Sequence, residues 1–212
     1  MGDVDMNDQT LEASAVSDAL DQLSAPGGSP RGLTEMSRSA TPVVGRARTA
    51  TVVDSDDPNI PGLAEFLDKA QPGDMLVLGW EADRRASVWG GLAATRTAAT
   101  GCVGLVTDGW IRDVDEVRAM PLLVWAAGST PRSGKGRLAV VRVGEPAQVG
   151  GQCVGHGDLV VADHTGVCVV RSSHETEVRE LAIELQDRDE AFRRALLAGA
   201  DFRGARQTAK TM

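Results

Sequence analysis

The chain has 212 residues, 42% of them hydrophobic, and a formal net charge of −8 at pH 7. This length allows one sizeable domain or two small ones. The acidic balance excludes a general nucleic-acid-binding surface, which needs a basic face, but it still allows a local pocket for a small anion.

The first half of the chain alternates helical and strand patterns. Residues 1–12 are polar and predicted to be disordered, and the hydrophobic spacing over 13–23 predicts a helix. A loop rich in glycine and proline follows at 24–32. The other elements expected here are a strand at 43–53, a helix at 61–70, a strand at 75–79, a charged loop at 81–87 and a helix at 88–100.

Short strands dominate the second half, before a final helix. Strands are predicted at 122–126, 138–143, 148–154, 159–162 and 167–170. Ser172 and Glu175 form a capping-box pattern at the start of the last helix. Its apolar stripe consists of Val178, Leu181, Leu185, Phe192 and Leu196. We therefore predict a compact single α/β domain over 13–200, with a strand-rich, barrel-like core, flanking helices, a long C-terminal helix and a polar tail at 201–212.

The most informative segment joins a buried strand to a polar turn. The apolar run 102–107 is followed by Asp-Gly-Trp-Ile-Arg-Asp at 108–113. Ligand sites of α/β proteins lie at the carboxyl ends of such strands. Arg112 offers a planar fork for a carboxylate, and Asp113 offers an oxygen ligand for Mg²⁺ or Mn²⁺. Asp113 also matches a helix N-cap, with Glu116 completing a capping box, and the two roles are compatible.

The glycine-rich segment Gly90, Gly91, Leu92 and Ala93 opens the helix that precedes this strand. Helix N-termini bind carboxylates through free N–H groups, and glycine permits close approach. An ordinary glycine-containing helix start gives the same pattern. The four tryptophans likewise fit either core and interface packing or the wall of an apolar pocket.

Several other kinds of site are disfavoured. The segment 128–136 has the wrong spacing for a phosphate-binding loop, and no dinucleotide fingerprint follows a strand. None of the three lysines ends a buried strand, which disfavours Schiff-base chemistry. The spacing of the cysteines and histidines fits neither a zinc site nor a disulfide framework. Because the sequence has neither a secretory signal nor a long apolar span, we expect a cytoplasmic protein that does not enter the membrane.

Several blocks, in the same order along the chain, resemble the 4-hydroxy-4-methyl-2-oxoglutarate aldolase and ribonuclease-regulator A-like (RraA-like) family. The strongest are Gly-Asp-Met-Leu-Val-Leu at 73–78, Arg-Arg-Ala-Ser-Val-Trp-Gly-Gly-Leu-Ala at 84–93 and the segment 104–116. Ser-Asp-Ala-Leu at 17–20, Gly-Ser-Thr-Pro at 128–131 and the segment 157–167 also match. The resemblance covers roughly 13–199 and implies a domain of the swivelling β/β/α type.

The resemblance also implies an activity and an assembly. Aldolases of this family cleave 4-hydroxy-4-methyl-2-oxoglutarate to two pyruvates and decarboxylate oxaloacetate, in both cases through a pyruvate enolate and a divalent metal. By position, Arg112 would bind the oxo-acid, Asp113 would hold the metal, and the backbone of Gly90 to Ala93 would receive the substrate carboxylate. The implied assembly is a ring-shaped homotrimer, sometimes stacked to a hexamer, with sites at subunit interfaces.

One position departs from the aldolase pattern. The family's aldolases carry an acidic residue, then twenty residues, then Arg-Asp, and Gly91 occupies the acidic position here. The regulators also lack this acid. Glu81 and Asp83, in the preceding loop, are candidates for a substitute carboxylate.

The leading hypothesis is therefore a metal-dependent lyase acting on a pyruvate-derived oxo-acid. The alternatives are a non-catalytic trimer that binds a partner such as a ribonuclease, and a diverged enzyme with another substrate.

Overall fold

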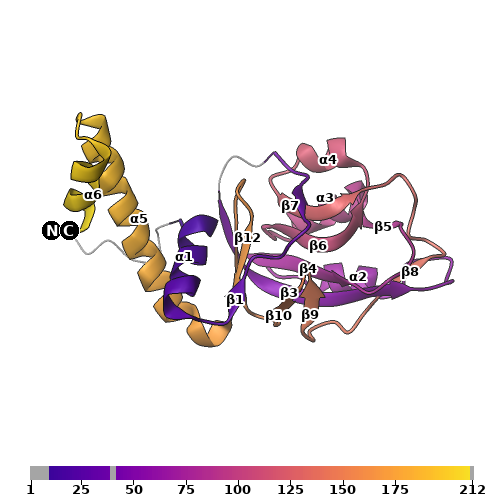
Figure 1. Ribbon diagram of the computed structural model, residues 1–212. Helices are drawn as coiled ribbons and strands as arrows, with labels where there is room; N and C mark the ends of the chain where they lie inside the picture. Colours follow the sequence, from indigo (N-terminus) through magenta and orange to yellow (C-terminus); the bar gives the residue numbers. More distant parts are fainter. Residues whose placement is uncertain (1–9, 39–41, 211–212) are drawn as a thin grey trace.

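The computed structural model describes residues 10–38 and 42–210, and its long strand β3 (Val43–Asp54) organises the fold (Figure 1). Residues 46–52 of β3 pair in parallel with β4 (Asp74–Trp80). The first residues of β3 pair antiparallel with β11, and its last residues pair antiparallel with β8. One strand thus joins both halves of the chain, which makes the molecule a single mixed α/β domain.

The main sheet has ten strands, in the order β1-β12-β11-β3-β4-β6-β7-β2, with β5 beside β6 and β8 beside β3. β3, β4, β6 and β7 run parallel to one another. The remaining strands of this sheet are β1 (Gly27–Gly28), β2 (Thr34–Glu35), β5 (Ser87–Trp89), β6 (Gly104–Ile111), β7 (Leu123–Ser129), β8 (Leu138–Val141), β11 (Leu159–Ala162) and β12 (Val167–Val170).

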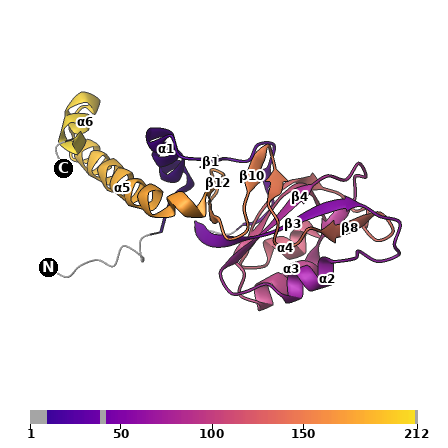
Figure 2. The same cartoon turned by 90° about the horizontal axis from the view of Figure 1, so that it is seen from below.

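Three short helices cover one face of the parallel strands (Figure 2). They are α2 (Leu63–Asp68), α3 (Gly91–Ala99) and α4 (Val114–Arg118). Their buried side chains Phe66, Ala94 and Val117 belong to one hydrophobic cluster with the inward-facing residues of β3, β4, β6 and β7. This packing fixes the starts of α3 and α4 relative to the carboxyl end of β6.

A small hairpin and two helices cover the rest of the sheet. The hairpin of β9 (Ala147–Val149) and β10 (Gln152–Val154) packs Val149 and Val154 into a second hydrophobic cluster. Helix α1 (Ala13–Leu23) and the first half of α5 (Glu175–Leu197) form a third cluster with β11 and β12. We call this packed first half of α5 the root. Beyond the root, α5 and α6 (Phe202–Lys210) project from the sheet as an arm (Figures 1 and 2).

Most predicted elements are present, with corrections at their ends. The predicted helix at 88–100 is the strand β5 followed by α3, and the predicted strand at 148–154 is the hairpin β9–β10. The tail 201–212 contains α6. Of the residues predicted to be disordered, 1–9 lie outside the described part, but Leu11 is fully buried against α1 and α5. The packed chain therefore begins before residue 13.

The capping box predicted at Ser172 is not formed. Ser172–His174 is a short 3₁₀ helix without a side-chain cap, and α5 begins at Glu175. Glu175 instead pairs with Arg46 of β3 and with Arg179. None of the described helices is long and apolar enough to cross a membrane.

Candidate functional site

Strands β5 and β6 place Arg112 at an exposed edge of the sheet. β6 extends through Ile111, so the segment Asp-Gly-Trp-Ile is strand and the turn begins only at Arg112. Trp89 of β5 pairs with Ile111, and the Arg112 N–H donates to the Trp89 carbonyl at 3.1 Å. The Arg112 backbone is therefore fixed, while 40% of its side chain stays exposed to bind a ligand.

The first acid of this motif, Asp108, has a structural role. Its carboxylate accepts the backbone N–H groups of Trp80 and Gly150, each at 2.9 Å. Burial raises the pKa of Asp108 above its ordinary value. Asp108 therefore ties β6 to β4 and to the β9–β10 turn and is not part of the candidate site.

Asp113 caps a different helix from the one predicted. It occupies the N-cap position of α4, but its side chain makes no cap bond there, so the capping box with Glu116 is not formed. Its backbone is left-handed, with φ 54° and ψ 43°. In this conformation Oδ2 accepts the Gly91 N–H at 3.0 Å and lies 3.2 Å from Arg112 Nε. Asp113 thus joins the start of α3 to the start of α4.

Gly90 permits this close approach. A Cβ atom at position 90 would lie 2.7 Å from Arg112 Cγ and 2.7 Å from Asp113 Oδ2. Any larger residue would displace both functional side chains. The glycine-rich start of α3 and the Arg-Asp turn are therefore packed against each other, as the sequence predicts.

A cavity of about 200 Å³ lies beside Arg112. Four of the predicted substrate-binding residues line it, namely Gly90, Leu92, Ala93 and Arg112. The other lining residues are Ile60, Leu63, Ser87, Val88, Trp89, Ser133 and Lys135. The cavity thus combines an apolar wall with two cations, which suits a small anionic ligand with a carbon chain.

Arg112 also lines a second hollow. This hollow is lined by Arg112, Asp113, Val114, Ser129, Thr130 and Pro131. Arg112 therefore lines both hollows. Among the described residues, the amides of Leu92 and Ala93 in the first turn of α3 have no acceptor, because Asp113 takes only that of Gly91.

The sequence did not reveal that Glu116 lies beside Gly91, although Glu116 lines neither hollow. A Cβ built on Gly91 would lie 1.8 Å from Glu116 Oε2 and 3.5 Å from Asp113 Cβ. The Glu116 carboxylate thus occupies the space into which a side chain at position 91 would project. Its place in an apparent capping box concealed this contact, which depends on how α3 and α4 pack.

The two acids proposed as substitutes have other surroundings. Glu81 forms an ion pair with Arg142 after β8. Asp83 is exposed, and its backbone N–H donates to Asp54 at 3.2 Å. In the described part of the chain, neither carboxylate is hydrogen-bonded or ion-paired to Arg112 or Asp113.

The donor set around Asp113 fits a cation held largely by water. Across the described residues, no three His, Cys, Asp or Glu side chains are grouped closely enough to enclose a metal. Mg²⁺ commonly binds through only one or two carboxylates and keeps several waters. The bonds of Asp113 to other described residues use Oδ2, which leaves Oδ1 for such a cation.

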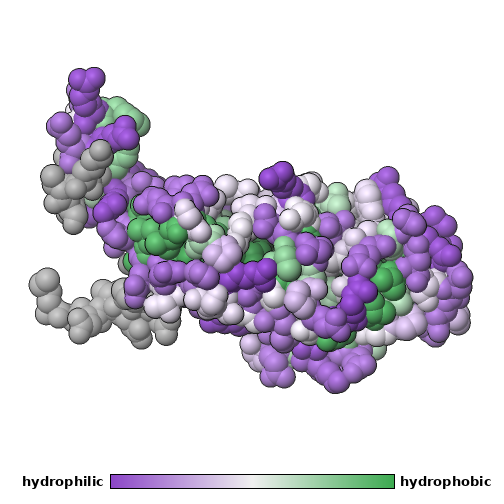
Figure 3. Space-filling view, turned by 60° about the horizontal axis from the view of Figure 1, so that its bottom comes forward, coloured by the Kyte–Doolittle hydropathy of each residue, from purple (hydrophilic) through white to green (hydrophobic). Residues whose placement is uncertain are grey.

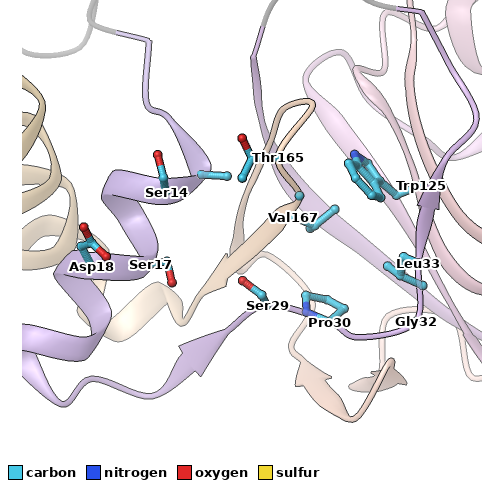
Figure 4. Close-up of a pocket in the computed structure, with 12 residues that line it drawn as sticks. Ser14, Ser17, Asp18, Ser29, Pro30, Gly32, Leu33, Trp125, Thr165 and Val167 are labelled. Carbon is cyan, nitrogen blue, oxygen red and sulfur yellow. The ribbon is translucent and has the colours of Figure 1, made fainter.

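A larger cavity, of about 400 Å³, lies away from Arg112 (Figure 4). It is lined by α1, the loop before β2 and the β11–β12 turn, and it includes Ser14, Ser17 and Trp125. Trp125 Nε1 donates to the Asp163 carbonyl at 3.2 Å. The tryptophans thus divide: Trp89 lines the cavity beside Arg112, Trp125 lines this second one, and Trp80 and Trp110 pack against Gly109 and Gly128.

The fold is shared with solved structures. One is an uncharacterized protein from Pseudomonas syringae pv. tomato, which matches with a TM-score of 0.81 and 28% identity over 92% of each chain. Another is a Streptomyces coelicolor protein described as an unusual member of the RNase ES inhibitor RraA protein family. It matches with a TM-score of 0.74 and 28% identity, over 85% of this chain and 90% of that one.

The sequence comparison points to the same group. A Halalkalibacterium halodurans protein named "Putative 4-hydroxy-4-methyl-2-oxoglutarate aldolase" is 30% identical over 188 residues, which cover 89% of this chain and 86% of that protein. The RraA-like family model, described as Aldolase/RraA, matches residues 13–169. Because the family model covers most of the chain and the relative is matched over most of both sequences, the chain belongs to the RraA-like family.

Proposed function

We propose that this protein is a divalent-metal-dependent carbon–carbon lyase acting on a pyruvate-derived 2-oxo-acid. Its substrate would resemble 4-hydroxy-4-methyl-2-oxoglutarate, and oxaloacetate decarboxylation would be a companion reaction. The observation that carries the proposal is the position of Arg112, which lines a ligand-sized cavity at the start of α3 and lies beside the Asp113 carboxylate. The name of the Halalkalibacterium halodurans relative gives independent support.

The cavity offers a complementary group for each part of such a substrate. The free amides of Leu92 and Ala93 suit the carboxylate next to the oxo group. Lys135 forms no ion pair with another described residue and lines the same cavity, so it suits a second carboxylate. Ile60 and Leu63 provide an apolar wall for the carbon chain between the two.

The chemistry requires that negative charge be stabilised on an enolate oxygen. Cleavage of the C3–C4 bond leaves its electron pair on the pyruvate fragment, as the negative charge of an enolate oxygen. The Arg112 guanidinium is a permanently charged hydrogen-bond donor that can stabilise this charge. Asp113 would hold the divalent cation, with water completing the coordination. When bound, such a cation supplies a Lewis acid.

We also propose that the protein works as a homotrimer, alone or stacked to a hexamer. The support is family membership and the exposed apolar residues at the end of the α5–α6 arm, where Leu197 is 83% and Phe202 67% exposed. Hydrophobic groups this exposed commonly mark an interface.

One observation favours a second function, a non-catalytic regulator that binds a protein such as a ribonuclease. Gly91 stands where the aldolases of the family carry an acid. The Streptomyces coelicolor neighbour is described as belonging to an inhibitor family. A regulator would need no acid at this position.

The two functions are separated by a screen of 2-oxo-acids, with pyruvate release as the readout. We expect the purified protein to release pyruvate with Mg²⁺ or Mn²⁺, to stop when a chelator is added, and to recover when the metal is restored. Pyruvate release no faster than with metal alone, for every oxo-acid and both metals, would reject the lyase and favour the regulator.

A further inference from the structure

Glu116 places a carboxylate where the side chain of residue 91 would lie. A Cβ built on Gly91 would lie 1.8 Å from Glu116 Oε2, so a side chain at position 91 would push the flexible Glu116 side chain aside. Gly91 has no left-handed φ that would demand glycine. Glycine at position 91 therefore leaves room for the Glu116 carboxylate in its present position.

The Glu116 carboxylate has no structural role among the described residues. Within the described part of the chain, Glu116 forms neither a side-chain hydrogen bond nor an ion pair, whereas its neighbour Asp115 lies 3.6 Å from Arg118. Glu116 also lies at the first turn of α3, where unpaired N–H groups favour a negative charge. A carboxylate with no structural partner beside a candidate site is available for proton transfer.

We propose that Glu116 is the proton-transferring residue of this site, delivered from α4 in place of the acid that position 91 lacks. The inference rests on the proposed lyase function. During aldol cleavage, the proton of the substrate 4-hydroxyl passes to the Glu116 carboxylate and the C4–O bond becomes a carbonyl. The C3–C4 bond breaks, and its electron pair passes into the pyruvate enolate. Protonated Glu116 then returns the proton to C3, which completes the second product and restores the carboxylate.

Decarboxylation of oxaloacetate provides an internal comparison. That reaction has no hydroxyl proton to remove, so it depends on the anion-binding groups much more than on a base. General-base catalysis contributes about 10²–10⁴ to a rate. Glu116→Gln should therefore lower aldol cleavage much more than it lowers decarboxylation.

The first experiment measures both reactions in the parent, in Glu116→Gln and in the matched control Asp115→Asn. We expect Glu116→Gln to lower the ratio of cleavage to decarboxylation by about 10² or more and to remove the acidic limb of the pH–rate profile for cleavage. Asp115→Asn should behave as the parent does. If Glu116→Gln cleaves at the parent rate, or loses both activities equally, the inference is wrong and the lyase stands. A parent inactive in both reactions rejects the lyase and the inference together.

The second experiment places a side chain at position 91, in the space that the Glu116 carboxylate occupies. Gly91→Ala should raise the melting temperature, because alanine is the better helix former, yet it should lower aldol cleavage because its Cβ displaces the Glu116 carboxylate. Adding Glu116→Gln to Gly91→Ala should cause little further loss, since both changes remove the same group. In Glu116→Ala, adding Gly91→Asp should restore part of the cleavage. Fully additive losses, with no rescue by Gly91→Asp, would overturn the inference.

Discussion

Asp113 precedes helix α4, but its carboxylate accepts a hydrogen bond from the first residue of helix α3. A left-handed backbone costs roughly 1–2 kcal/mol for most residues, and less for Asp and Asn. A hydrogen bond from a buried N–H to a charged group contributes about 1.5–3 kcal/mol. The bond from Gly91 therefore offsets the strain, and it holds Asp113 next to Arg112.

We therefore expect Asp113→Asn to have a small effect on stability and a large effect on activity. Asparagine tolerates the left-handed backbone and still accepts the Gly91 N–H, so the melting temperature should fall by only a few degrees. The loss of charge should abolish metal-dependent pyruvate release. Calorimetry and a pyruvate assay check both effects, with Asp115→Asn as the control. An Asp113→Asn protein that unfolds, together with a parent insensitive to chelators, would show that Asp113 is only structural.

For the residues around Arg112, the sequence predicted which segments lie together but not which side chains touch. The family resemblance placed the start of α3 and Arg112 in one site, and both line the same cavity. The pattern Asp113-x-x-Glu116 reads the same whether the two side chains cap their own helix or reach across to another. That choice depends on how α3 and α4 pack on the sheet, which a local pattern does not encode.

Among the elements, α5 is attached to the sheet by an ion pair at its first residue. Glu175 Oε1 accepts from Arg46 Nη2 of β3 at 2.8 Å, and Arg46 is the main cause of a lowered pKa for Glu175. The glutamate side chain is 18% exposed and the arginine 51%, so water screens the pair considerably. We expect it to contribute about 1 kcal/mol or less at neutral pH.

The sign of its pH dependence follows from the lowered pKa. This stabilisation is complete above the ordinary glutamate pKa of 4.5 and is lost as the pH falls through the lower, folded value. Glu175→Gln should therefore lower the melting temperature by about 2–4 °C at most, with a difference that is constant at neutral pH and disappears in acid. Glu180→Gln, at an exposed position of the same helix, is the control. A difference that grows in acid would contradict the assignment.

The element boundaries that the sequence missed are those set by pairing partners. The apolar pattern ends at Thr107, but β6 continues to Ile111 because β5 and β7 supply backbone partners there. The hairpin β9–β10 was read as one strand, although Gly150 and Gly151 both have positive φ and form its turn. The bounds of α1, β3 and β11 were predicted nearly to the residue.

For the whole molecule, the outstanding feature is the α5–α6 arm. Its root packs on α1, and Phe192 meets Phe202 edge-on at a centroid distance of 4.9 Å. Hydrophobic surface lies where the arm joins the body (Figure 3), and Leu197 and Phe202 are exposed near its tip. A projecting helical arm with apolar ends is suited to contact another copy of the chain.

We therefore expect sedimentation at micromolar concentration to give the mass of three or six chains. Replacing both Leu197 and Phe202 with Asp should lower this mass, because each change puts a charge into the proposed interface. Val143→Asp, at another exposed hydrophobic residue that is 40% accessible, should not. A monomer at these concentrations would reject the assembly.

In the proposed reaction, Arg112 stabilises the developing enolate. We would measure kcat/KM for metal-dependent oxaloacetate decarboxylation, above the rate with metal alone, in the parent and in Arg112→Met. Arg118→Met, on the neighbouring helix α4, is the control. Loss of one preorganised donor to a developing oxyanion costs about 10²–10³ in rate. We predict a loss of this size for Arg112→Met and none for Arg118→Met, and an Arg112→Met enzyme as active as the parent would contradict the account.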